Sequence, residues 1–198
     1  KEYENFMEKA RDIFVSEKLY KELKFDTDYL SSKNIEEFSI NLSKYQQLGN
    51  FYNSGYFISK LIDDSKDENF MIHTNYLDYL ISNLGYKNTK NITINGNTGN
   101  WVGCEMIGGS IAIKGDTGAG VGWSMQKGII TVNGNAGYYV GHLMQNGIIN
   151  VNGNAGDYVG ESMKDGSITI DGNAEGWVGC EMQNGVITIG GNAGDFIG

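Results

Sequence analysis

His142 and Glu161 are the residues of this sequence best suited to acid–base chemistry. They lie 19 residues apart, which is also the spacing at which the C-terminal part of the sequence repeats. If one repeat forms one coil of a stack, the two side chains lie about 5 Å apart on adjacent coils. An imidazole beside a carboxylate can transfer a proton or bind a metal ion weakly. Surface residues that are neighbours by chance explain the pair better. An enzyme or a small-ligand-binding protein with a shallow site on this face is therefore the alternative hypothesis.

Other metal-binding and thiol signals are weak. His73 and His142 are the two histidines, which excludes a site built from several histidines. Cys104 and Cys180 occupy the same position of the first and fifth repeats, and four coil spacings separate them by about 19 Å. Because a disulfide requires Cα atoms within about 7 Å, we expect free thiols, which fit a reducing compartment.

The glycine-rich segments match no phosphate-binding motif. Residues 118–122 read Gly-Ala-Gly-Val-Gly, which is neither a P-loop nor the glycine pattern of dinucleotide-binding folds. The sequence therefore identifies no catalytic, cofactor-binding or metal-binding residue, and it implies no cofactor.

The elements that would carry these side chains are copies of a 19-residue repeat. The copies run without insertion or deletion, and the sixth stops at Gly198. They begin at Ile92, Ile111, Ile130, Ile149, Ile168 and Ile187, and we number the positions of each copy from this isoleucine. A fixed period of this length is typical of a solenoid, in which each copy is one unit stacked on its neighbour.

Within each copy, the apolar positions predict the interior of the stack. Positions one and three are Ile or Val and should point inward from a strand, with position two outward. Position seven is small, position eleven is Val or Ile, position twelve is Gly, and position fifteen is Met in every complete copy. We interpret the methionines as core filler rather than metal ligands. Asn or Asp at position six should cap turns by hydrogen-bonding along the stack.

Stacking these copies in register predicts a mainly β protein. The expected fold over residues 92–198 is a single-stranded parallel β-helix with 19-residue coils and two or three short strands per coil. The handedness rule for crossover connections predicts a right-handed coil, and a left-handed β-helix stays open as the alternative on the residues alone.

Residues 1–91 are expected to form a small, mainly helical N-terminal cap, with a boundary near 88–91. They contain only three of the 29 glycines, and a cap would cover the exposed end of the first coil. Apolar periodicity and capping residues predict helices over 2–23, over 35–48 after an Asn34 cap, over 51–62, and over 76–84 between an Asn75 cap and Gly85. Residues 70–72 could form a short strand. A module that binds a small ligand through this aromatic-rich part is a third hypothesis.

The negative charge of the chain limits the kinds of partner that it can bind. The formal net charge is −9, and only three of the 15 basic residues follow residue 91. Neither part offers a basic patch, so nucleic acid and anionic membrane surfaces are not expected partners. No apolar run is long enough to span a bilayer and the N-terminus does not resemble a signal peptide, so we expect a cytoplasmic protein.

The glycine pattern resembles that of a known repeat family. The spacing G-x-x-G-x-x-x-G occurs at Gly134, Gly137 and Gly141, and again 19 residues later. It is similar to the GXGXG repeat of the C-terminal β-helix domain of the glutamate synthase large subunit. The stretches 153–160 and 177–182 are more similar to the β-helix subunit of formylmethanofuran dehydrogenase.

The resemblance implies a right-handed β-helix and an architectural role, because in both enzymes this module packs against the catalytic domains. No catalytic residue carries over, since the shared motif consists of glycines and core positions. We therefore expect a non-catalytic structural or assembly module of a multi-subunit oxidoreductase. Its partners would be other protein subunits or a second copy, bound through the β-helix face or the open C-terminal coil.

Overall fold

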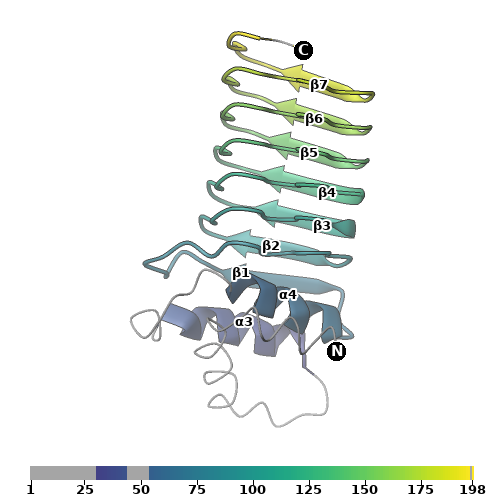
Figure 1. The fold of residues 1–198 in the computed structure, drawn as a ribbon. Coiled ribbons are helices and arrows are strands. Elements are labelled where there is room, and N and C mark those ends of the chain that lie inside the picture. Colours follow the sequence, from purple (N-terminus) through teal and green to yellow (C-terminus); the bar gives the residue numbers. More distant parts are fainter. Residues whose placement is uncertain (1–29, 44–53, 197) are drawn as a thin grey trace.

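A computed structural model describes residues 30–43, 54–196 and 198 of the chain. It confirms the mainly β parallel β-helix. Seven parallel strands form one sheet in chain order, and successive coils stack along one axis (Figure 1). The strands are β1 (Asn69–His73), β2 (Asn91–Asn95), β3 (Ile107–Ile113), β4 (Lys127–Val132), β5 (Ile148–Val151), β6 (Ser167–Ile170) and β7 (Val186–Ile189).

The strands pair in the register that the repeat predicts. Ile111 lies opposite Ile130, and each following copy pairs in the same way. The isoleucines and valines at positions one and three are buried from β2 to β6, with the residue between them more exposed. The methionines of the first four copies are fully buried, which confirms that they fill the core.

Each coil contains one strand rather than the two or three expected. A second point of pairing is an isolated parallel bridge at position seven, as between Ala136 and Ala155. The residues on either side of this bridge form bends and turns and not a second extended segment. The coil therefore consists of one strand, one bridge residue and connecting turns.

Position six forms the polar ladder that the sequence predicts. In each pair of neighbouring coils, the side-chain oxygen accepts a hydrogen bond from the backbone N–H of the same position one coil later, at 2.7–2.8 Å. The residues are Asn97, Asp116, Asn135, Asn154, Asn173 and Asn192. The ladder links every copy to the next, outside the sheet.

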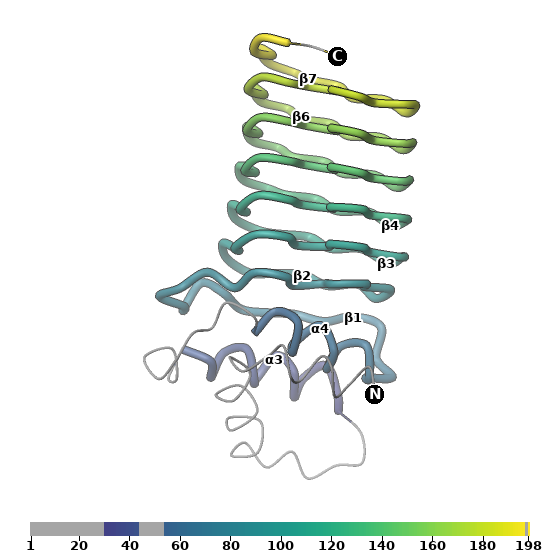
Figure 2. The backbone as a smooth tube through the Cα atoms, viewed as in Figure 1, coloured from purple at the N-terminus to yellow at the C-terminus, as the bar shows by residue number. Residues whose placement is uncertain are grey.

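The stack begins at β1, inside the range expected to be the cap. The predicted strand at 70–72 is confirmed, and Phe70 pairs with Ile92 at an offset of 22 residues. The loop after β1 reaches further out than the corresponding turns of later coils (Figure 2). The boundary near 88–91 therefore marks the start of the regular repeat and not the start of the sheet.

The predicted helix over 76–84 is wrong, because this segment is a diverged coil. Gly103 N–H donates to the Leu84 carbonyl at 2.9 Å, just as Gly122 N–H donates to the Val102 carbonyl. Gly85 has φ +72°, and a Cβ there would lie 2.4 Å from Ile111 Cδ1. Hydrogen bonds to the following coil thus replace the intrahelical ones, and Leu84-Gly85 is the counterpart of the Val-Gly of later copies.

Two helices, α3 (Ser32–Asn41) and α4 (Ser54–Asp64), lie beside β1 at the end of the stack (Figure 1). Ser31 and not Asn34 caps α3, and Asn34 completes a capping box as the third helical residue. The helix predicted at 51–62 is confirmed from Ser54 onward. The helix predicted over 2–23 lies outside the described residues, as do the parts of the predicted helices that fall within 44–53.

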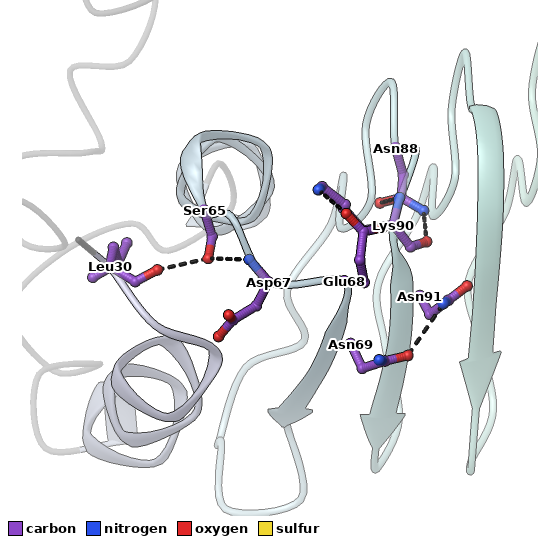
Figure 3. A network of polar contacts seen from close by, with 8 residues as sticks. All are labelled: Leu30, Ser65, Asp67, Glu68, Asn69, Asn88, Lys90 and Asn91. Atoms are coloured by element: carbon purple, nitrogen blue, oxygen red, sulfur yellow. Dashed lines mark hydrogen bonds and ion pairs between the residues drawn. The ribbon is translucent and has the colours of Figure 1, made fainter.

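Polar contacts link the segments that flank the two helices, and others link the β1 segment to the β2 segment (Figure 3). Ser65 Oγ, after α4, donates to the Leu30 carbonyl at 2.6 Å. Lys90 Nζ lies 2.6 Å from Glu68 Oε1, and Asn91 Nδ2 donates to Asn69 Oδ1 at 3.1 Å. His73 at the end of β1 contacts α3: its backbone N–H donates to Ser39 Oγ at 3.0 Å, and its Nε2 lies 2.9 Å from Glu36 Oε1. With the buried Ile35, Phe38 and Leu42 of the α3 segment, these contacts make the helices a cover for the first coil.

Candidate interaction face

The structure brings His142 and Glu161 together, as their spacing predicts. His142 Nδ1 lies 2.9 Å from Glu161 Oε2, although the two atoms are not aligned as a hydrogen bond. The imidazole packs on the Trp123 ring, with 4.0 Å between ring centroids. Both side chains are largely buried, with exposed fractions of 15% and 23%.

This pair lacks the further groups that metal chemistry needs. Within residues 30–43, 54–196 and 198, no three side chains of His, Cys, Asp or Glu are grouped closely enough to hold a metal ion. His142 Nδ1 is buried against the coil rather than presented to solvent. The contact therefore serves packing between coils better than proton transfer to a substrate.

A small hollow lies at the other end of the stack, between α4 and the first coil. Its lining includes Ser59, Gly85, Tyr86 and Lys90, and its volume is about 10 Å³. That volume is about what one water molecule requires. This hollow by itself therefore holds nothing larger than a water molecule, and the ligand-binding hypothesis for the N-terminal part stays a prediction.

The cysteines also lie apart from any reactive arrangement. Cys104 and Cys180 are both free and partly exposed. Burial, and then the negative charge of Glu105, raise the pKa of the Cys104 thiol to about 11, while Lys87 partly opposes them. Since the thiolate is the nucleophile, Cys104 is not activated for catalysis.

An aromatic column at position ten, which the sequence reasoning missed, lies on the surface of the stack. Tyr158 stacks on Tyr139 with 4.9 Å between centroids, and Trp177 stacks on Tyr158 at 5.9 Å and on Phe196 at 4.4 Å. Their planes differ by only 14–15°. Trp177 is 38% exposed and Phe196 is 66% exposed.

The column is interrupted at Gly120, and two tryptophans surround the gap. A Cβ at Gly120 would lie 2.5 Å from Trp101 Cδ1, so the Trp101 side chain occupies the space that this glycine leaves. Trp123, at position thirteen, meets Tyr139 in an edge-to-face arrangement, with 5.9 Å between the two ring centroids. We call the rings of Trp101, Trp123, Tyr139, Tyr158, Trp177 and Phe196 the aromatic ridge.

Backbone strain shows that the turn itself does not require aromatic residues. The five aromatic residues at position ten have φ between +59° and +62°, a conformation that costs a residue with a Cβ about 1–2 kcal/mol. Gly120 adopts the same turn with φ +75° and no such cost. Five copies nevertheless carry Trp, Tyr or Phe here, so the rings contribute stacking, a surface, or both. Reading position ten down the six copies would have revealed the column in the sequence.

The face around the ridge is acidic. Positions eight to fourteen of the six copies contain no Lys or Arg. They contain six carboxylates: Glu105, Asp157, Glu161, Glu175, Glu181 and Asp195. Glu105 lies 3.7 Å from Lys87 of the first coil, and in the described part of the chain none of the other five pairs with Lys or Arg.

The negative surroundings also act on the ridge itself. Burial against its neighbours, followed by the nearby Tyr139, Asp157 and Glu161, raises the pKa of Tyr158. Each of these acidic groups disfavours a further negative charge on the phenol. The face thus combines exposed and half-buried rings with carboxylates that no Lys or Arg among the described residues neutralises.

Comparison of the chain with models of known protein families and with curated proteins returned no match. Among the residues that the structure describes, no helix is long and apolar enough to cross a membrane.

Proposed function

We propose that this chain is a non-catalytic assembly module that docks another protein within a larger complex. The observation that carries the proposal is the aromatic ridge, an ordered row of rings on a rigid stack, in which Trp101, Trp177 and Phe196 are exposed and the other three are half-buried. Tyr and Trp are the residues most enriched at protein–protein interfaces and their hot spots. The glycine pattern resembling subunits and domains of multi-subunit oxidoreductases supports the same role, and makes such an enzyme the complex to test first.

The rigidity of the stack fits this role. The repeated side chains at positions one, three, eleven and fifteen face the core, and the position-six ladder ties successive coils. A solenoid of this kind presents an extended surface whose shape changes little on binding. A partner can therefore dock without ordering the module first, which lowers the entropic cost of association.

Native mass spectrometry tests the assembly role. The chain, tagged and purified gently from cells that express it naturally, should appear in a complex with other subunits. Its own mass is 21.7 kDa. Recovery as a monomer alone, at every ionic strength tested, would contradict the proposal.

An enzyme with a site at His142 and Glu161 is the second candidate, and the 2.9 Å contact between these side chains is what favours it. Trp123 closes one side of the imidazole. Replacement of Glu161 by Gln keeps the shape of the pair and removes its charge. Loss of an activity of the purified complex in Glu161→Gln, without loss of any subunit, would favour the enzyme over the assembly module.

A further inference from the structure

The stacked geometry of the ridge decides what kind of surface it offers. Tyr158 has Tyr139 on one face and Trp177 on the other, and Trp177 lies between Tyr158 and Phe196. Sugars and nucleobases bind aromatic side chains by lying on a ring face. Because both faces of these two rings are occupied, only ring edges point outward. A row of edges forms an apolar strip, which suits contact with apolar side chains of another protein.

The charge pattern determines which protein surface fits. Glu175 and Glu181 lie on either side of Trp177 in the sequence, and Asp195 directly precedes Phe196. All three carboxylates are exposed. Asp157 accepts a hydrogen bond from Gly176 N–H at 2.7 Å, which holds its carboxylate close to the same coil. Complementary charges steer association and exclude partners with like charge. A partner surface must therefore bring Lys or Arg to the edges of the strip.

The same charges disfavour a second copy of this chain. The chain carries a net charge of −9, and its ridge lies in a region without Lys or Arg at positions eight to fourteen. A symmetric contact would place one acidic strip on another. Like charges brought together at an interface weaken association and exclude such a partner.

We propose that the strip from Tyr139 to Phe196 binds a different protein, through an apolar patch bordered by arginine and lysine. This inference rests on the proposed assembly function and adds the surface and the chemistry of the partner. Trp177, central in the strip, is the anchor, and Glu175, Glu181 and Asp195 are the charges that the basic rim meets.

Site-specific photo-crosslinking in the native cells tests the surface. The crosslinker p-benzoylphenylalanine is placed at position 177, and at Thr131 as the control, because Thr131 is the outward residue of β4 on the sheet face. The trapped protein is identified by mass spectrometry and purified. We expect crosslinks from position 177 to one protein with a basic, apolar surface, and none to it from position 131.

Binding of that purified protein then tests the chemistry. Trp177→Gly removes the anchor while relieving backbone strain, and should weaken binding at least about 30-fold, the loss expected for a hot spot. Glu175→Gln with Glu181→Gln and Asp195→Asn should slow association and flatten its dependence on salt. Circular dichroism of each variant establishes that it is folded.

The possible failures are distinct. A partner that crosslinks from Thr131 and binds Trp177→Gly with unchanged affinity would leave the assembly function intact and overturn the strip. Crosslinks from position 177 to a second copy of the chain would overturn the basic partner. No crosslinked protein at either position, together with a monomer by native mass spectrometry, would overturn the assembly function as well.

Discussion

The strained turn at position ten yields the sharpest test of the structure, a comparison of Trp177→Gly with Trp177→Ala. Trp177 has φ +62° and stacks on Tyr158 and Phe196 at 5.9 and 4.4 Å. Both substitutions remove both stacking contacts. They differ only in the Cβ, so their difference in unfolding free energy isolates the backbone conformation.

The magnitudes follow from two contributions, stacking and backbone conformation. Loss of two aromatic pairs costs about 1–3 kcal/mol in either variant. Ala retains the penalty of the left-handed conformation, about 1–2 kcal/mol, whereas Gly has none but loses about 0.5–1 kcal/mol of stability through its more flexible unfolded chain. Trp177→Ala should therefore be destabilised by about 2 kcal/mol, and Trp177→Gly by about 1 kcal/mol.

Urea unfolding followed by far-ultraviolet circular dichroism measures this difference. The comparison requires that the two variants have the same slope of unfolding free energy against urea concentration. Ala155 supplies the matched control. It is 4% exposed, forms bridges to Ala136 and Ala174, and has no positive φ. Ala155→Gly should therefore lower stability by about 1 kcal/mol or more. If Trp177→Ala proved as stable as Trp177→Gly, position ten would not adopt the left-handed turn and the argument that its rings are there for a surface would fail.

Two further predictions concern the core and the thiol. Gly141→Ala should destabilise the protein by about 2–5 kcal/mol, because its Cβ would lie 2.4 Å from Ile168 Cδ1 at φ +69°. In a double-mutant cycle, Ile168→Val should restore the stability that Gly141→Ala loses to the steric clash, but not the stability that it loses to the positive φ. Simple additivity of the two changes in urea-unfolding free energy would count against the contact. In a Cys180→Ala background, Cys104 should react with iodoacetamide about 100-fold more slowly at pH 8 than an ordinary cysteine, because its pKa of about 11 leaves little thiolate. The rate should rise about tenfold per pH unit as the pH approaches that pKa, and a plateau at the pKa of an ordinary thiol would contradict the burial argument.

The wrong prediction of a helix over residues 76–84 has a physical origin. Residues 76–84 carry apolar residues at a spacing that fits a helix, and Asn75 and Gly85 resemble its caps. The same residues also satisfy a coil in which Ile81 and Leu84 face the core. Local pattern cannot choose between these solutions, because the hydrogen bonds that decide come from Gly99 and Gly103 of the next coil.

The aromatic ridge marks a different limit. Its column at position ten is visible in the sequence, yet its contact with Trp123 at position thirteen is not. That contact depends on the turn at position twelve, where Gly122 and Gly141 take φ +66° and +69° and return the chain toward position ten of the neighbouring coil. The direction of the outward rings is likewise set by the positive φ of position ten.

The order of residues alone is enough to predict the period, the strand at the start of each copy, the buried columns and the Asn/Asp ladder, because a residue repeated at a fixed interval occupies an equivalent place in every coil. It also predicts that His142 and Glu161 are neighbours, since they differ by one period. The three-dimensional arrangement was needed to show that the first coil begins at β1, that one strand suffices per coil, and that the rings stack with their edges outward. These features depend on backbone conformation at turns and on hydrogen bonds between coils, which the residues of one copy do not specify.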